Sequence, residues 1–211
     1  MLAMPRLIET LVAAFTDDPL YRWLYPDPAA RADSLWYTFG LLLAAGHETG
    51  AVHADPTGSA VAVWTPPGVA LLDRRGEQAL VAGLRRRVGS RAALAATGTA
   101  MQMGSRQALP SWTLHCVAVH PAVQDRGLGA ALLAPVLDGS DAAGVRVYLD
   151  SSNARNHTFF RRLGFEAVVE APIGDGGPTV HTMVRAAAAR SVAASSHFRH
   201  ESVWIGDKVG A

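Results

Sequence analysis

The sequence lacks most features that mark special classes of protein. Its 211 residues include one cysteine, Cys116, which excludes a disulfide framework and any metal site built on several thiolates. The longest apolar stretches, such as 41–45, fall far short of the roughly 18 residues that a transmembrane helix needs. No basic segment followed by a long apolar run opens the chain, so no secretory signal is predicted. We therefore expect a cytoplasmic protein without a membrane partner.

Charge is also scarce and almost balanced. Lys and Arg number 19 and Asp and Glu number 18, which gives a formal net charge of +1, and Lys208 is the single lysine. A dedicated nucleic-acid-binding protein usually concentrates a basic excess, so we expect no nucleic-acid partner. Hydrophobic residues, in contrast, make up 49% of the chain, which is enough to bury a core. The length predicts one domain.

Hydrophobic spacing and turn signals divide the chain into helices and strands. The first half predicts a helix over 5–16, an aromatic-rich loop or irregular helix over 19–29, a helix over 30–46, a hairpin of strands 51–54 and 59–64, and two helices within 77–107. The second half predicts strands over 112–119, 145–150, 165–171 and 179–184, a helix from Gly127, and a helix over 154–163 that ends at Gly164. Cys116 is expected to share a buried strand face with Leu114 and Ala118. The order predicts a mixed α/β fold with helices on both faces of one sheet.

The turn after the strand over 112–119 has the clearest chemical pattern. It joins a strand to a helix through two glycines, Gly127 and Gly129, whose amides an anion can approach closely. The helix start adds N–H groups without intrahelical partners, and Arg126 adds a full positive charge. The ending of a Walker loop and the three-glycine spacing of a dinucleotide fingerprint are both missing. The turn therefore predicts a pyrophosphate site built mainly from backbone; the alternative is an ordinary turn whose glycines serve packing.

A second motif follows downstream, with Asn156, Phe159, Gly164 and Phe165. Together with Gln124, Gly127 and Gly129, it resembles the two motifs of the GNAT superfamily of N-acetyltransferases. Within the superfamily, the layout of residues 5–185 is most similar to that of the puromycin N-acetyltransferases. The resemblance implies a GNAT-type acyl-CoA N-acyltransferase fold with a mostly antiparallel central sheet over residues 1–185, followed by a tail over 186–211 of unknown role. The superfamily normally has a strand before its first helix, whereas this sequence begins almost within that helix. Two explanations stay open: the natural start lies upstream, or the sheet lacks this first strand.

The resemblance also implies acetyl-CoA as co-substrate, without a metal. The expected contacts of acetyl-CoA are Val117, Ala118, Val119, Gln124, Asp125, Arg126, Gly127, Leu128, Gly129, Ala130, Asn156, Phe159 and Arg162. The strand that ends at Val119 is expected to separate from its neighbour around a bulge. The amide of Val119 would then stabilise the negative charge that develops on the thioester oxygen.

Acetylation of an amine needs a proton acceptor, because an amine with a pKa of about 10.4 is mostly protonated at neutral pH. We expect Asp150, at the end of the strand over 145–150, to be this base, although it could simply cap the next loop; His120 and His157 are alternatives. The tyrosine that acts as the acid in the superfamily is Phe160 here. The proton for the leaving thiolate would then come from water or from a hydroxyl such as that of Ser151.

Three aromatic residues, Tyr21, Trp23 and Tyr25, lie between the first two predicted helices. In the superfamily this connection borders the acceptor pocket, so the cluster favours a flat or apolar amine, although core packing explains it equally well. The sequence thus predicts an acetyl-CoA-dependent N-acetyltransferase that acts on a primary amine of an antibiotic-like or xenobiotic-like small molecule. A protein N-terminal or lysine acetyltransferase and an acyl-CoA-binding module without catalysis stay open. The resemblance allows a homodimer without requiring one.

Overall fold

The computed structural model describes residues 3–49, 51–89, 110–174 and 176–187. Its helices are α1 (Met4–Phe15), α2 (Pro19–Leu24), α3 (Pro28–Glu48), α4 (Arg74–Val88), α6 (Leu128–Ala143) and α7 (His157–Arg162), with two 3-10 turns, η1 (Pro121–Val123) and η2 (Ala154–Asn156). Its strands are β1 (Val52–Ala54), β2 (Ala60–Thr65), β3 (Ser111–Val119), β4 (Arg146–Ser151), β5 (Glu166–Pro172) and β6 (Thr179–Arg185). None of the described helices is both long and apolar enough to cross a membrane.

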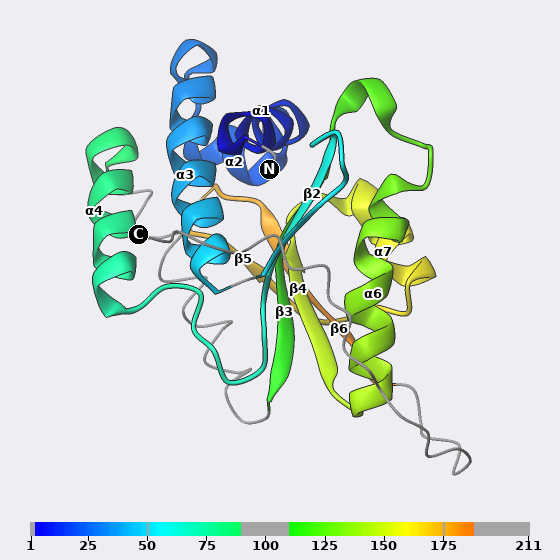
Figure 1. The fold of residues 1–211 in the computed structure, drawn as a ribbon. Coiled ribbons are helices and arrows are strands. Elements are labelled where there is room, and N and C mark those ends of the chain that lie inside the picture. The colour runs from blue at the N-terminus through cyan, green and yellow to red at the C-terminus, as the bar shows by residue number, and fades with distance from the viewer. Residues whose placement is uncertain (1–2, 50, 90–109, 175, 188–211) are drawn as a thin grey trace, which may run out of the picture.

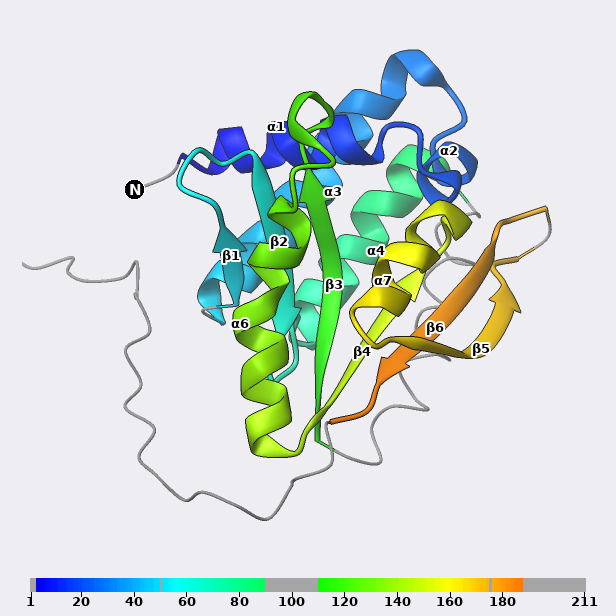
Figure 2. The same ribbon diagram turned by 90° about the vertical axis from the view of Figure 1, so that its right-hand side faces the viewer.

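The strands form one six-stranded sheet in the order β1-β2-β3-β4-β6-β5 (Figure 1). Every neighbouring pair is antiparallel except β3 with β4, which run parallel. Helices α1 and α3 lie on one side of the sheet, and α6 and α7 lie on the other (Figure 2). The predicted mixed sheet with helices on both faces is thus confirmed. The first element in the described residues is α1, and β1 forms one edge of the sheet.

Each face of the sheet has its own apolar core. On one face, Leu11 of α1 and Phe39 of α3 are fully buried in a cluster with residues of β2 and β3. On the other, Leu133 of α6 and Phe160 of α7 are buried in a cluster around Trp64. Burial of one such side chain contributes roughly 1.5–3 kcal/mol. The two cores hold the strands between the helix layers and so fix the strand ends, from which the loops of the site emerge.

A bulge in β3 changes which side chains share a face. In the pairing with β2, Val63 lies opposite Cys116 and Trp64 lies opposite Leu114, so His115 is an additional residue on β3. Leu114 consequently belongs to the core with Trp64, whereas Cys116 belongs to the core with Val63. The prediction that Leu114 and Cys116 share one face was wrong, because the additional residue reverses the alternation of side chains.

Two segments differ in kind from the sequence prediction. The aromatic-rich segment begins with the regular helix α2, whose first residue is Pro19 and whose N-cap is Asp18, a side chain that accepts a hydrogen bond from the Leu20 amide at 2.9 Å. The helix predicted over 154–163 is instead the turn η2 followed by α7. Gly164 has φ of 85°, as expected for a glycine just beyond a helix end. The second helix predicted within 77–107 falls mostly in 90–109, and the tail mostly in 188–211, both outside the described residues.

Candidate functional site

The two parallel strands at the centre of the sheet separate toward one end. Strands β3 and β4 pair only from Ser111 with Arg146 to Leu114 with Leu149. Beyond this point β3 stays with β2 as far as Val119, and β4 stays with β6 as far as Ser151 (Figure 2). The result is a V-shaped opening between the strand ends. The separation begins at the bulged residue, as the sequence analysis predicted for a strand that splays around a bulge.

The edge of β3 that faces this opening presents main-chain groups. The His120 amide donates to the Ser59 carbonyl at 2.8 Å, and hydrogen bonding alternates along an antiparallel pair. Val117 and Val119 therefore turn their amide and carbonyl groups away from β2, toward the opening. The Val119 carbonyl accepts a hydrogen bond from the Gln124 side-chain amide at 3.0 Å. The Ala118 side chain is buried in the core.

The glycine turn lies at the mouth of the opening, between β3 and α6. Its backbone has positive φ at Asp125 (61°) and at Gly127 (77°), the residue that precedes the first turn of α6. No side chain caps this helix start, so the amides of its first turn have no intrahelical partner and point out of the helix end. Arg126 and Gly127 are exposed. The turn thus presents amide donors and one arginine to solvent, which fits the pyrophosphate of acetyl-CoA.

The downstream motif packs directly on this turn. The Phe159 ring of α7 lies over Gly129 of α6, 3.4 Å from where a Cβ atom would stand, which is ordinary van der Waals contact. Asn156 lines the cavity described below. Arg162 is exposed in the last turn of α7. The two motifs, far apart in the sequence, therefore meet at the same end of the sheet.

A cavity of about 120 Å³ occupies the opening between β3 and β4, which at about 30 Å³ per molecule is room for roughly four water molecules. Five segments of the chain line it: Phe15, Asp18, Leu20 and Tyr21; Leu114, His115, Cys116 and Val117; Leu149, Asp150, Ser151 and Ser152; Asn156 and Phe160; and Ile173 and Val180.

Comparisons with known proteins agree with this geometry. Residues 76–167 match the family model of the Acetyltransferase (GNAT) domain. The fold is that of a GNAT acetyltransferase. A structure from Corynebacterium glutamicum, described as histone acetyltransferase HPA2 and related acetyltransferase, is 23% identical, with a TM-score of 0.61 over 90% of this chain and 93% of the other. Drosophila melanogaster polyamine N-acetyltransferase is 20% identical, with a TM-score of 0.53 over 87% and 94%.

A third structure with this fold is arylalkylamine N-acetyltransferase 2 from Aedes aegypti, which is 13% identical, with a TM-score of 0.58 over 87% of this chain and 94% of the other. At these identities the likeness establishes the fold, and the Acetyltransferase (GNAT) domain model matches residues 76–167. The finer resemblance to the puromycin N-acetyltransferases stays a prediction.

Asp18 is a buried carboxylate that lines the cavity. It is 7% exposed, and its Oδ1 atom accepts hydrogen bonds from the Leu20 amide at 2.9 Å and from the Ser152 hydroxyl at 3.0 Å. Burial raises the pKa of Asp18 above its usual 3.8, and the hydrogen bonds offset only part of this rise. A carboxylate with a raised pKa is a stronger base. In the sequence, an Asp directly before Pro signals the start of a helix, and nothing in this local pattern indicates that Asp18 lines a cavity.

Asp150 and Ser151 end β4 at the cavity wall. The Thr182 hydroxyl of the neighbouring strand β6 donates to Asp150 Oδ1 at 2.7 Å. The Ser151 hydroxyl donates to the Asn153 carbonyl at 3.3 Å, so it already has an acceptor within the loop. The structure thus brings Asp150 and Asp18 to one cavity, while their chemical roles stay predictions.

The three aromatic residues predicted near the acceptor have different surroundings. Tyr21 lines the cavity, and burial raises its pKa well above 10. Trp23 lies against the turn between β5 and β6, 3.2 Å from a side-chain carbon built at Gly177. Tyr25 is 3% exposed and its hydroxyl hydrogen-bonds to Thr38 at 2.6 Å. Only Tyr21 of the three is among the residues that line this cavity.

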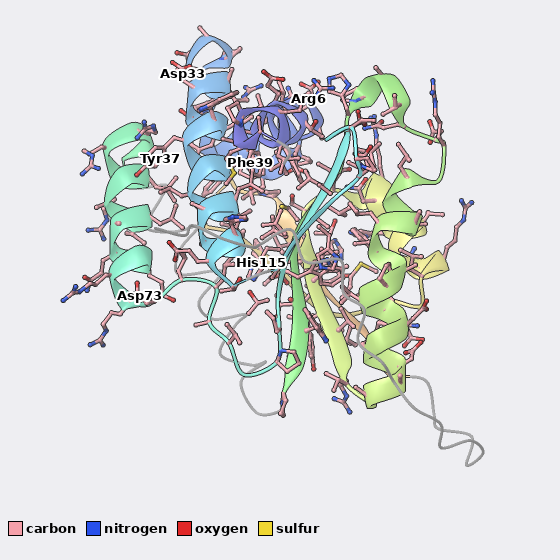
Figure 3. The ribbon with its side chains drawn as sticks, in the orientation of Figure 1. Arg6, Asp33, Tyr37, Phe39, Asp73 and His115 are labelled. Atoms are coloured by element: carbon pink, nitrogen blue, oxygen red, sulfur yellow. The ribbon has the colours of Figure 1, made fainter. Side chains whose placement is uncertain are left out.

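His115 is a cavity residue that the sequence pattern did not single out. Its Nε2 atom lies 2.6 Å from the Thr65 hydroxyl, and its side chain lies on the α3 side of the sheet (Figure 3). The bulge places it there, and a bulge between two strands has no signal in a single sequence. Among the described residues, no group of three or more His, Cys, Asp and Glu side chains is arranged to hold a metal ion.

Proposed function

We propose that this protein transfers an acetyl group from acetyl-CoA to the primary amine of a small molecule. The observation that carries the proposal is the cavity between β3 and β4, where the open edge at Val117 meets the carboxylates of Asp18 and Asp150. Two proteins of the same fold are named for amine acceptors, polyamines in one and arylalkylamines in the other. A primary amine is the chemistry that such a pair of carboxylates recognises, because the ammonium form is attracted to both.

Acetyl-CoA would supply the activated acetyl thioester. The main-chain groups of Val117 and Val119 would bind its extended arm as a neighbouring strand does, and the amides around Gly129 would bind its pyrophosphate, with Arg126 adding charge. This arrangement aims the acetyl end of the arm at the cavity, where the Val119 amide, or that of Val117, can hydrogen-bond the acetyl oxygen.

Asp18 and Asp150 would have different roles toward the amine: one removes its proton and the other orients it. We assign removal of the ammonium proton to Asp18, because burial raises its pKa and its side chain is held by Ser152. We assign attraction and orientation of the amine to Asp150, which Thr182 holds at 2.7 Å. The proton that the leaving thiolate needs would come from water, because Phe160 has no hydroxyl group to donate.

The walls of the cavity favour a compact acceptor. Apolar side chains from α2 and from the β5–β6 hairpin, Leu20, Ile173 and Val180, line it together with Tyr21. A volume of about 120 Å³ holds the reacting end of an amine, and the apolar walls favour a small acceptor with apolar parts.

The experiment is a panel of acceptors assayed with acetyl-CoA. Release of free CoA is followed by a thiol reagent, and the acetylated product is identified by mass spectrometry. The panel contains aliphatic monoamines, diamines, arylalkylamines and peptides with a free N-terminus or lysine. We expect at least one small amine to yield product in equal amount to free CoA. Turnover of peptides alone would make the protein a protein acetyltransferase; a rise in Tm with acetyl-CoA and no turnover would make it a binding module.

A further inference from the structure

A buried histidine stands beside the cavity with one ring nitrogen unused. His157, the first residue of α7, is 6% exposed, and its Nε2 atom has no hydrogen-bond partner. Among buried side-chain nitrogen and oxygen atoms in the described residues, only Trp64 Nε1 shares this condition. An indole N–H always keeps its hydrogen, whereas a bare imidazole nitrogen gains one in mild acid. His157 is therefore the one of the two that can change its charge.

Four elements surround the His157 ring. The Ser151 carbonyl at the end of β4 faces the imidazole, and since Nε2 is unpartnered, Nδ1 is the ring nitrogen in position to donate to it. The His181 ring of β6 lies 4.3 Å from the His157 ring, edge to face. His181 Nδ1 lies 3.0 Å from Glu170 Oε1 of β5. Arg161 of α7 itself adds positive charge nearby. One carboxylate thus faces two imidazoles and a guanidinium.

Three cavity residues depend on this contact. Ser151 holds the His157 ring through its carbonyl, Asn156 directly precedes His157, and Phe160 follows it by one helical turn. All three line the cavity. His157 therefore links the start of α7 to the end of β4. This link fixes the positions of the three residues in the cavity wall.

We propose that His157 is a positioning residue that holds the cavity wall of β4 and α7 in its working geometry only while its imidazole is uncharged. The proposal rests on the proposed acetyl transfer for its kinetic readout. A proton added at Nε2 would place a buried charge beside His181 and Arg161, with Glu170 already engaged by His181. The ring would then have to leave its pocket, and Ser151, Asn156 and Phe160 would lose their common anchor.

The charges around His157 indicate the pH range of this effect. Burial, and then the charges of His181 and Arg161, lower the pKa of His157 below its usual 6.5. The unfolded chain therefore binds this proton more readily than the folded chain, and stability rises with pH in that window. The contribution is fully present above pH 6.5 and is lost as the pH falls through the lower pKa of the folded protein. The working geometry is thus expected near neutral pH and above.

The first test compares pH profiles of His157→Asn and wild type with one acceptor. Asparagine does not titrate, and its amide can donate to the Ser151 carbonyl in place of Nδ1. We expect kcat/KM of His157→Asn to stay within about threefold of wild type at pH 8, and the wild type to fall by up to about tenfold per pH unit relative to this variant in acid. His157→Ala has no side-chain donor for the Ser151 carbonyl, so its kcat/KM should be lower than that of wild type both in acid and at pH 8. The exposed His47→Asn is the matched control and should follow the wild type. Identical acid limbs for wild type and His157→Asn would overturn the proposal.

A second test needs no activity and so separates this proposal from the proposed function. NMR titration of the histidine rings reports the charge of His157 directly, and Tm with and without acetyl-CoA reports the cavity wall. We expect His157 to stay neutral down to a pH below 6.5, and the Tm gain from acetyl-CoA to shrink on its protonation in wild type but not in His157→Asn. A His157 that titrates at or above 6.5, or an equal Tm gain at both pH values in wild type, would contradict the proposal even if no acceptor is found.

Discussion

The proposed site has two halves, one for the coenzyme and one for the acceptor amine, and the two are built by different means. On the coenzyme side, a single stretch of chain, 117–130, provides the strand edge, the turn and the start of α6, and its chemistry lies in main-chain amides. On the acceptor side, the cavity joins Asp18 of the α1–α2 connection, His115 of β3, Asp150 of β4 and Ile173 after β5, and its chemistry lies in side chains.

This difference explains which half tolerates change. Main-chain amides survive most substitutions as long as the backbone keeps its conformation, so the coenzyme half depends on glycines at a few positions. A pocket of side chains changes with every residue that lines it, so one fold can serve many acceptors. The names of the solved relatives agree with this view, because polyamine and arylalkylamine enzymes have the same fold.

The largest effect is expected from the buried carboxylate of the acceptor half. Asp18→Asn keeps an N-cap for α2 but removes the base, so kcat/KM should fall by about 10²–10⁴-fold, with the Kd of acetyl-CoA unchanged. Because burial raises the Asp18 pKa, the charged form is unfavourable in the folded chain at pH 7, and the variant should be at least as stable as wild type. The exposed neighbour Asp17→Asn is the control. Equal kcat/KM values for the Asp18→Asn and Asp17→Asn variants would show that Asp18 is not the base.

Cys116 tests whether the acceptor half is closed to bulk water, because this buried thiol lines the cavity and should react slowly with reagents in solution. Burial raises the pKa of this thiol to about 12, against about 8.5 in an unfolded chain. At pH 8 the folded protein should react with iodoacetamide about 10³-fold more slowly than the protein in denaturant. Since Cys116 is the single cysteine, intact mass reports its alkylation directly. Comparable rates in the two states would mean that the cavity opens to bulk water.

A glycine variant tests the coenzyme half. Gly127 has φ of 77°, so Gly127→Ala is strained by roughly 1–2 kcal/mol. Relaxation of the turn should weaken acetyl-CoA binding by about tenfold, measured by calorimetry. Gly144→Ala has a similar strain, at φ of 69° beyond the other end of α6, and should lower stability without changing the Kd. A similar loss of affinity in both variants would indicate a general effect on α6.

The smallest effect separates the roles of the two carboxylates. Asp150→Asn retains an acceptor for the Thr182 hydroxyl but loses the charge, which is worth about 1 kcal/mol or less at a partly exposed position. We expect KM for the amine to rise about fivefold with little change in kcat. Steady-state kinetics with one acceptor measures both. A fall in kcat of a hundredfold would instead make Asp150 the base, as the sequence alone predicted.

The sequence predicted most of the fold, and it indicated the proposed coenzyme half, because both depend on local patterns. The alternation of Val61 and Val63, the glycines of the turn and the stop at Gly164 each act through their own backbone or through near neighbours. Most boundaries agree with the structure to within one or two residues. The opening between β3 and β4 followed from the resemblance to a family in which a bulge separates these strands.

The acceptor half could not be predicted in the same way. Asp18 lines the cavity together with Ser152, which is 134 positions away in the sequence and 3.0 Å away in space. His115 lies in the cavity because β3 contains one residue more than β2 can pair. Tyr25, which the sequence placed near the acceptor, uses its hydroxyl to bond Thr38. These contacts depend on which elements meet in space, and the composition of one segment does not contain that information.

The most direct test is amide hydrogen exchange, with and without acetyl-CoA, followed residue by residue. The account predicts slower exchange at the amides of Val117, Val119 and the first turn of α6, where main-chain groups face the coenzyme, and unchanged exchange in the β1–β2 hairpin. Protection confined to other parts of the chain, or none at saturating acetyl-CoA, would contradict the claim that the open edge of β3 and the glycine turn form the coenzyme site.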